Sequence, residues 1–125
     1  MAEILLIAAD RHLRALVRAQ LLDEGYAVRA LPSLGIAMAY LARSGEQPRL
    51  TILDMQGLDI EAQALSDLWR LSGEAPLILC GGMLSRTALS QRGLPPTARV
   101  LLRPFRVGDL VEEVKKVYYG RQRAP

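Results

Sequence analysis

The sequence predicts an α/β protein built on one open, doubly wound parallel sheet, and three observations support this fold class. Five short apolar segments alternate with five segments of helical periodicity along the 125 residues, which is typical of parallel strands joined by crossover helices. The first segment, residues 3–9, is almost wholly apolar, as in a strand covered on both faces. Half of all residues are hydrophobic, which is enough for a core at this length. Right-handed crossovers then place helices on both faces of the sheet, in a three-layer sandwich.

The predicted strands are short apolar runs bounded by turn or breaker residues. Residues 26–31 alternate only loosely between apolar and polar, which indicates a more exposed strand, and Pro76 opens the fourth run. We expect strands at residues 3–9, 26–31, 49–55, 75–82 and 98–105.

The segments between these strands carry apolar residues at helical spacing. In the first of them Leu13, Val17 and Leu21 recur in this way. Asp10 is placed to cap this helix and Gly25 to end it. We expect helices at residues 10–25, 33–45, 60–73, 85–93 and 106–120. One domain then covers residues 1–120, and residues 121–125 form a tail or the start of a linker.

The composition excludes several classes of protein. No apolar run approaches the roughly 20 residues that span a bilayer, and no signal peptide is recognisable, so we expect a cytoplasmic protein with no membrane contact. The single cysteine, Cys80, excludes an internal disulfide.

The net charge of +3 is only mildly basic. No helix-turn-helix pattern or basic recognition helix is present, so we expect no direct contact with nucleic acid.

The residues that follow the strands are the candidates for a functional site. In open parallel sheets, ligands bind outside the carboxyl ends of the strands. Asp10, Asp54, Gly81 and Arg103 stand at such ends. Asp54 and Arg103 therefore point into one cleft, where a guanidinium can pair with the carboxylate and keep it ionised.

The segments “ILLIAAD”, “LTILDM”, “PLILCGG” and “LLRPF”, in this order and spacing, resemble the receiver domain of bacterial two-component response regulators over nearly the whole chain. The resemblance implies a flavodoxin-like fold with strand order 2-1-3-4-5. It also implies an aspartyl-phosphate chemistry carried by five positions, one of which is a pair of adjacent acidic residues.

Two of these positions concern the phosphoryl group and its metal ion. The phosphoacceptor position falls on Asp54, which is present, whereas the acidic pair that holds Mg²⁺ falls on Ala8 and Ala9. Because Mg²⁺ binds through hard oxygen ligands, Asp54 alone is a poor site. Asp10, next to the pair, is the one available substitute, although its position favours a helix cap.

The other three positions have also changed. The position of the Thr or Ser that contacts the phosphoryl group falls on Gly81, the phosphate-pairing lysine on Arg103 and the switch aromatic on Val100. We interpret Asp54 and Arg103 as an internal ion pair that replaces a regulated phosphate site. Asp54 as a plain capping residue is the simpler alternative.

The sequence therefore favours a pseudo-receiver, which is neither an enzyme nor a cofactor-binding protein and which signals through protein contacts. The main alternative is a working, atypical receiver that a histidine kinase phosphorylates on Asp54, with Mg²⁺ held by Asp10 and Asp54. A small-ligand binder of the same fold ranks last, because “AADRHL” is no phosphate-binding loop.

The face formed by residues 84–119 is the candidate surface for a protein partner or a homodimer, since receiver domains commonly use this face. Its apolar part could come from Leu110, Val114 and Tyr118, although core positions are an equal alternative. Mixed charges could supply interface ion pairs; they include Arg86, Arg99, Arg106, Asp109, Glu113 and Lys116.

Overall fold

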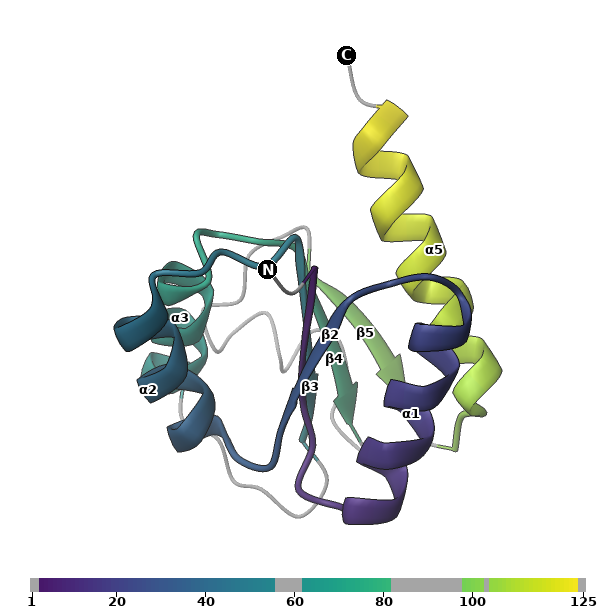
Figure 1. Ribbon diagram of the computed structural model, residues 1–125, viewed down its shortest axis with the longest axis horizontal. Coiled ribbons are helices and arrows are strands. Elements are labelled where there is room, and N and C mark those ends of the chain that lie inside the picture. The colour runs from purple at the N-terminus through teal and green to yellow at the C-terminus, as the bar shows by residue number, and fades with distance from the viewer. Residues whose placement is uncertain (1–2, 56–61, 82–97, 103, 124–125) are drawn as a thin grey trace.

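The computed structural model describes residues 3–55, 62–81, 98–102 and 104–123. Its five strands are all parallel and form one sheet in the order β2-β1-β3-β4-β5. Helices α1 and α5 cover one face of the sheet, and α2 and α3 cover the other (Figure 1). The predicted doubly wound fold and strand order 2-1-3-4-5 are confirmed.

Each strand lies within its predicted segment and is shorter than that segment. The three central strands are buried along their whole length, whereas the edge strands are partly exposed, as the loose alternation of residues 26–31 predicts. The strands are β1 Ile4–Ile7, β2 Val28–Leu31, β3 Leu50–Asp54, β4 Leu77–Gly81 and β5 Arg99–Leu102.

The described helices lie where the periodicity predicts them, and the helix expected at residues 85–93 lies outside the described residues. The helices are α1 Arg11–Asp23, α2 Leu34–Ser44, α3 Ala62–Leu71 and α5 Val107–Arg123. Helix α5 continues through residues 121–123, where the sequence predicts a tail. Gly120 does not end the helix, because a glycine inside a helix costs only about 1 kcal/mol and no proline follows it directly. The carboxyl end of α5 projects beyond the sheet (Figure 1).

Local signals set the helix ends. Asp10 Oδ1 accepts a hydrogen bond of 3.0 Å from the backbone N–H of Leu13, which confirms the predicted cap. The Ser33 hydroxyl accepts from Ile36 N–H in the same way at the start of α2. Helix α2 ends at Ser44 and is capped by Gly45, whose φ of 67° is the left-handed conformation that glycine adopts at little cost.

The core consists of two apolar layers, one on each side of the sheet. Leu53 and Leu79 pack under α2 and α3, and Ile52 and Ile78 pack under α1 and α5. All four side chains are fully buried. Alternation along β3 and β4 thus directs successive residues into opposite layers.

Tyr118 ties α5 to the amino-terminal edge of the sheet. Its hydroxyl donates to Glu3 Oε2 and accepts from Arg49 Nη1 at 3.2 Å, and its ring packs edge-on against Tyr26 with centroids 5.2 Å apart. The other carboxylate oxygen of Glu3 accepts from Ala27 N–H at 3.1 Å. We call Glu3, Tyr26, Arg49 and Tyr118 the amino-edge cluster. Burial raises the pKa of Tyr26 to about 12, so its hydroxyl stays protonated at neutral pH.

Among the described helices none is both long enough and apolar enough to cross a membrane.

Candidate functional site

The candidate site lies at the carboxyl ends of β1, β3 and β4, which meet at one edge of the sheet. Asp54 is the last residue of β3 and lies beside Cys80 of β4. Its side chain is buried, with 4% of the residue exposed. A buried carboxylate at this edge is the one acidic group that the strands themselves bring to the site.

A cationic side chain lies beside the two positions at which the resemblance implies an acidic pair. Ala8 is buried and Ala9 is exposed at the end of β1. The guanidinium of Arg14 donates from Nη1 to the carbonyl of Ala8 at 2.9 Å and to that of Ala9 at 3.5 Å. A positive charge is therefore fixed beside both alanines.

Arg14 is not among the predicted site residues, because it lies within a helix and does not follow a strand. One signal could have found it. Helical side chains lean toward the amino terminus of their helix. Arg14 follows the capping residue Asp10 by one helical turn, so its long side chain can reach back to the strand end.

Asp10 uses its carboxylate to cap α1, and the residue is exposed. This hydrogen bond occupies one of the two oxygens that a metal ion could use. Across the part of the chain that the structure describes, no group of three His, Cys, Asp or Glu side chains is placed to hold a metal ion.

Gly81 ends β4 and lies against Met55. A β-carbon added at Gly81 would lie 3.0 Å from Met55 Cε. The methionine, itself 8% exposed, fills the space into which a side chain at position 81 would extend. Restoring a Thr or Ser there would force the thioether to move, which a flexible methionine can do. The position thus offers an apolar surface and no hydroxyl.

Strand β5 carries Val100, which pairs with Leu79 and packs against the α2 and α3 layer. Its side chain is partly buried. Arg103, the predicted partner of Asp54, lies outside the described residues, so the ion pair stays a prediction.

The charges predicted to face a partner are largely engaged within the chain. Arg99 Nη1 lies 3.0 Å from Glu113 Oε2, and Lys116 Nζ lies 3.5 Å from Glu113 Oε1. Asp109 Oδ2 accepts a hydrogen bond of 2.9 Å from the backbone N–H of Arg106, at the start of α5. On the described part of this face, Arg99, Asp109, Glu113 and Lys116 are therefore engaged within the chain.

The apolar residues offered for the same face have other roles. Leu110 and Val114 are buried in the core beneath α5, so of the two predicted alternatives the core position holds. The spacing of apolar residues on α5 marks the stripe that faces the sheet. Tyr118 belongs to the amino-edge cluster, and Arg86 lies outside the described residues.

Cys80 is 1% exposed within β4 and packs in the α1 and α5 layer, as expected for a small hydrophobic residue. His12 is exposed on α1.

No protein-family model matches the chain, and no curated protein matches it in sequence. Solved structures match it in fold. A CheY-like response regulator receiver domain protein from Methanospirillum hungatei JF-1 has a TM-score of 0.78 at 23% identity, over 99% of each chain. A response regulator receiver protein from Sinorhizobium medicae WSM419 has a TM-score of 0.76 at 22% identity, over 94% of each chain. NtrX from Brucella abortus, crystallised with ATP, has a TM-score of 0.74 at 22% identity, over 97% of this chain and 28% of NtrX. The chain therefore has the fold of response regulator receiver domains.

Proposed function

We propose that this chain is a pseudo-receiver, a signalling domain that acts through protein contacts without Mg²⁺-dependent phosphorylation. One observation carries the proposal. Ala8 and Ala9 replace the acidic pair that the resemblance implies, and their carbonyls bind the guanidinium of Arg14.

Charge is the physical reason why this substitution matters. Transfer of a phosphoryl group to a carboxylate brings two anions together, and a metal ion neutralises the charge that develops. Mg²⁺ needs carboxylate or other hard oxygen ligands. At this edge of the sheet it would meet the like charge of Arg14 and, among the described residues, Asp54 as the one buried carboxylate.

The surroundings of Asp54 support the same proposal. Gly81 supplies no hydroxyl to a phosphoryl oxygen, and Met55 presents an apolar group there. Val100 provides no aromatic ring that could change its position when the site is modified. The residues that would bind a phosphoryl group and those that would respond to it are therefore both changed.

The proposed setting is a cytoplasmic signalling protein in which this domain contacts a protein partner. NtrX shows that a domain of this fold can form a minor part of a longer chain, since the match covers 28% of it. The proposal includes no enzymatic activity, no cofactor and no contact with membrane or nucleic acid.

The direct test measures the melting temperature with millimolar Mg²⁺, alone and with beryllofluoride, which mimics a phosphoryl group on aspartate. A ligand that binds only the folded state raises the melting temperature by mass action. We expect no change under either condition. An intact receiver domain with both acidic residues, measured in parallel, must show a clear rise.

Two variants separate this proposal from the alternative of a working, atypical receiver. Asp54→Asn removes the candidate phosphoacceptor, and Asp23→Asn is the matched control on the exposed surface of α1. A rise of several degrees that Asp54→Asn abolishes and Asp23→Asn leaves intact would overturn the proposal. It would instead favour the alternative of a working receiver, in which Asp10 and Asp54 hold Mg²⁺ and Asp54 is open to phosphorylation by a histidine kinase.

A further inference from the structure

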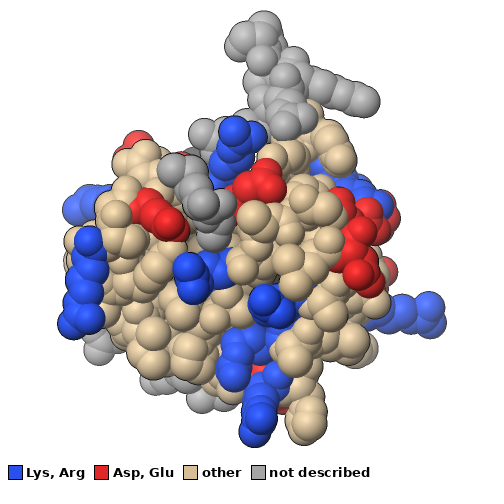
Figure 2. Space-filling model, viewed as in Figure 1, with Lys and Arg blue, Asp and Glu red and all other residues tan. Residues whose placement is uncertain are grey.

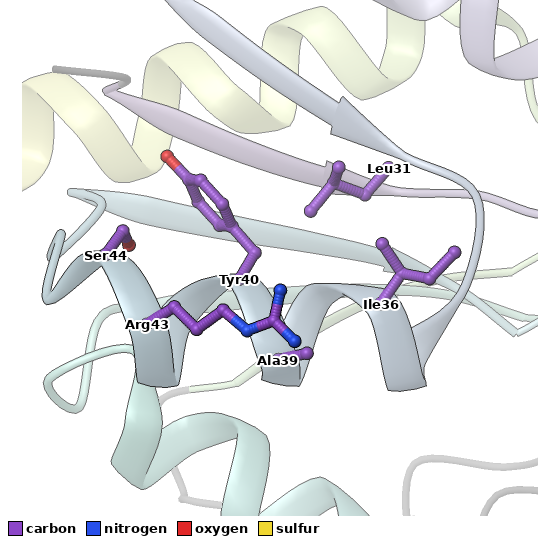
Figure 3. A pocket seen from close by; sticks show the side chains of 6 residues that line it. All are labelled: Leu31, Ile36, Ala39, Tyr40, Arg43 and Ser44. Carbon is purple, nitrogen blue, oxygen red and sulfur yellow. The ribbon is translucent and has the colours of Figure 1, made fainter.

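A groove runs along α2 beside the edge strand β2, away from the candidate site and from residues 84–119. Its volume is about 550 Å³. Figure 3 shows the side chains of both elements around it. The groove is lined by Leu31, Ile36, Ala39, Tyr40, Arg43 and Ser44.

Two apolar residues of this groove, Ile36 and Ala39, stay exposed, whereas Leu31 and Tyr40 also pack against the core. Ile36, Ala39, Tyr40 and Arg43 follow one another at helical spacing on one side of α2, and Ile36 is 50% exposed. The fully buried residues of α2, Ala37 and Leu41, lie on another side of the helix. A half-exposed isoleucine that lines a groove favours binding of an apolar group there, because the contact removes apolar surface from water.

The ring of Tyr40, which lines the groove, is fixed by two contacts. The hydroxyl of Tyr40 donates to the carboxylate of Glu46, and the guanidinium of Arg29 lies 5.2 Å from the centre of the Tyr40 ring. One contact comes from the loop after α2 and the other from β2. The ring therefore keeps its place without an occupant, which lowers the entropy lost on binding.

The rim of the groove is basic. Arg43 is exposed and makes no ion pair with any described residue, and Arg29 contributes a second positive charge. Glu46 is the acid nearest to the ring, and it already accepts the Tyr40 hydroxyl. Figure 2 shows several Lys and Arg side chains spread over the face that holds β2, α1 and α2, with Asp and Glu groups in its upper half and at its right border.

We infer that this groove binds an acidic, amphipathic segment of a partner protein. A large apolar side chain of the segment packs between Leu31 and Ile36 against the ring of Tyr40, and a carboxylate pairs with Arg43. The lining from Ile36 to Ser44 spans about 12 Å along the helix axis, which matches two turns of a partner helix. The inference does not depend on whether Asp54 is phosphorylated.

The test is an NMR titration of the ¹⁵N-labelled protein with a short helical peptide of leucine, glutamate and alanine, whose leucines form one stripe. We expect saturable shifts confined to residues 28–46. Ile36→Asp and Arg43→Glu should each weaken binding at least about tenfold, because one removes the apolar contact and the other reverses the rim charge. Arg70→Glu is the matched control, since Arg70 is exposed in the last turn of α3 and should leave binding unchanged.

Three outcomes would overturn the inference: no saturable shift, shifts centred outside residues 28–46, or equal weakening by Arg70→Glu and Arg43→Glu. A peptide with glutamine in place of glutamate tests the charge separately, and equal affinity for both peptides would contradict the acidic chemistry. Circular dichroism of each variant verifies that it is folded. The melting test of the proposed function uses different residues, so failure of one proposal leaves the other standing.

Discussion

Replacing Leu53 by alanine is expected to lower the free energy of unfolding by about 3–4 kcal/mol. Leu53 is fully buried in the central strand β3, directly before Asp54, and packs in the layer beneath α2 and α3. Its truncation removes buried apolar surface and leaves a cavity that the rigid centre of the sheet cannot close. Urea unfolding followed by circular dichroism measures the change.

Leu22→Ala is the matched control for this prediction, because Leu22 is 41% exposed on α1. Its effect should stay below about 1 kcal/mol. If Leu53→Ala cost no more than Leu22→Ala, the packing of β3 under α2 and α3 would be contradicted. The position of Asp54 at the carboxyl end of that strand would then also need revision.

Replacing Glu3 by glutamine should cost about 1–3 kcal/mol at pH 7, because it removes a charged acceptor of two hydrogen bonds. The carboxylate accepts from the Tyr118 hydroxyl and from Ala27 N–H. These bonds and the charge of Arg49 lower the pKa of Glu3 below its ordinary value of 4.5. A lowered pKa means that the stabilisation is present above this value and is lost as the pH falls through the pKa of the folded state.

Urea unfolding of both proteins between neutral pH and pH 3 tests the sign of this effect. The difference between wild type and Glu3→Gln should be largest near neutral pH and should shrink in acid. Glu74→Gln serves as the control, since Glu74 is exposed after α3. A difference that is independent of pH would show that Glu3 acts through packing and not through its charge.

The fold was predictable because its signals lie within single elements. Burial of β1 on both faces appears as a continuous apolar run, and the cap at Asp10 appears as an aspartate before a helical pattern. Strand order came from the resemblance alone, because alternation of strands and helices leaves several orders open. Helix α5 runs three residues past residue 120, where the sequence predicts its end.

The candidate site was only partly predictable, because its decisive contacts join elements that are separate in the sequence. The two alanines could be recognised by position, but Arg14 reaches them across the turn between β1 and α1. Likewise, Gly81 could be recognised as lacking a hydroxyl, but the closeness of Met55 depends on the register of β3 and β4. The buried state of Leu110 and Val114 depends on which side of α5 faces the sheet.

The amino-edge cluster has a consequence for how the chain folds during its synthesis. Glu3 and Tyr118 are 115 positions apart in the sequence, yet they share one hydrogen bond. Glu3, directly before β1, can therefore form this hydrogen bond only after α5 has left the ribosome. Until then Glu3 lacks the hydrogen bond from Tyr118, and the layer beneath α1 lacks the side chains that α5 contributes. The nascent domain thus completes its fold only after release of α5, and this contact between its two ends is a marker for completion.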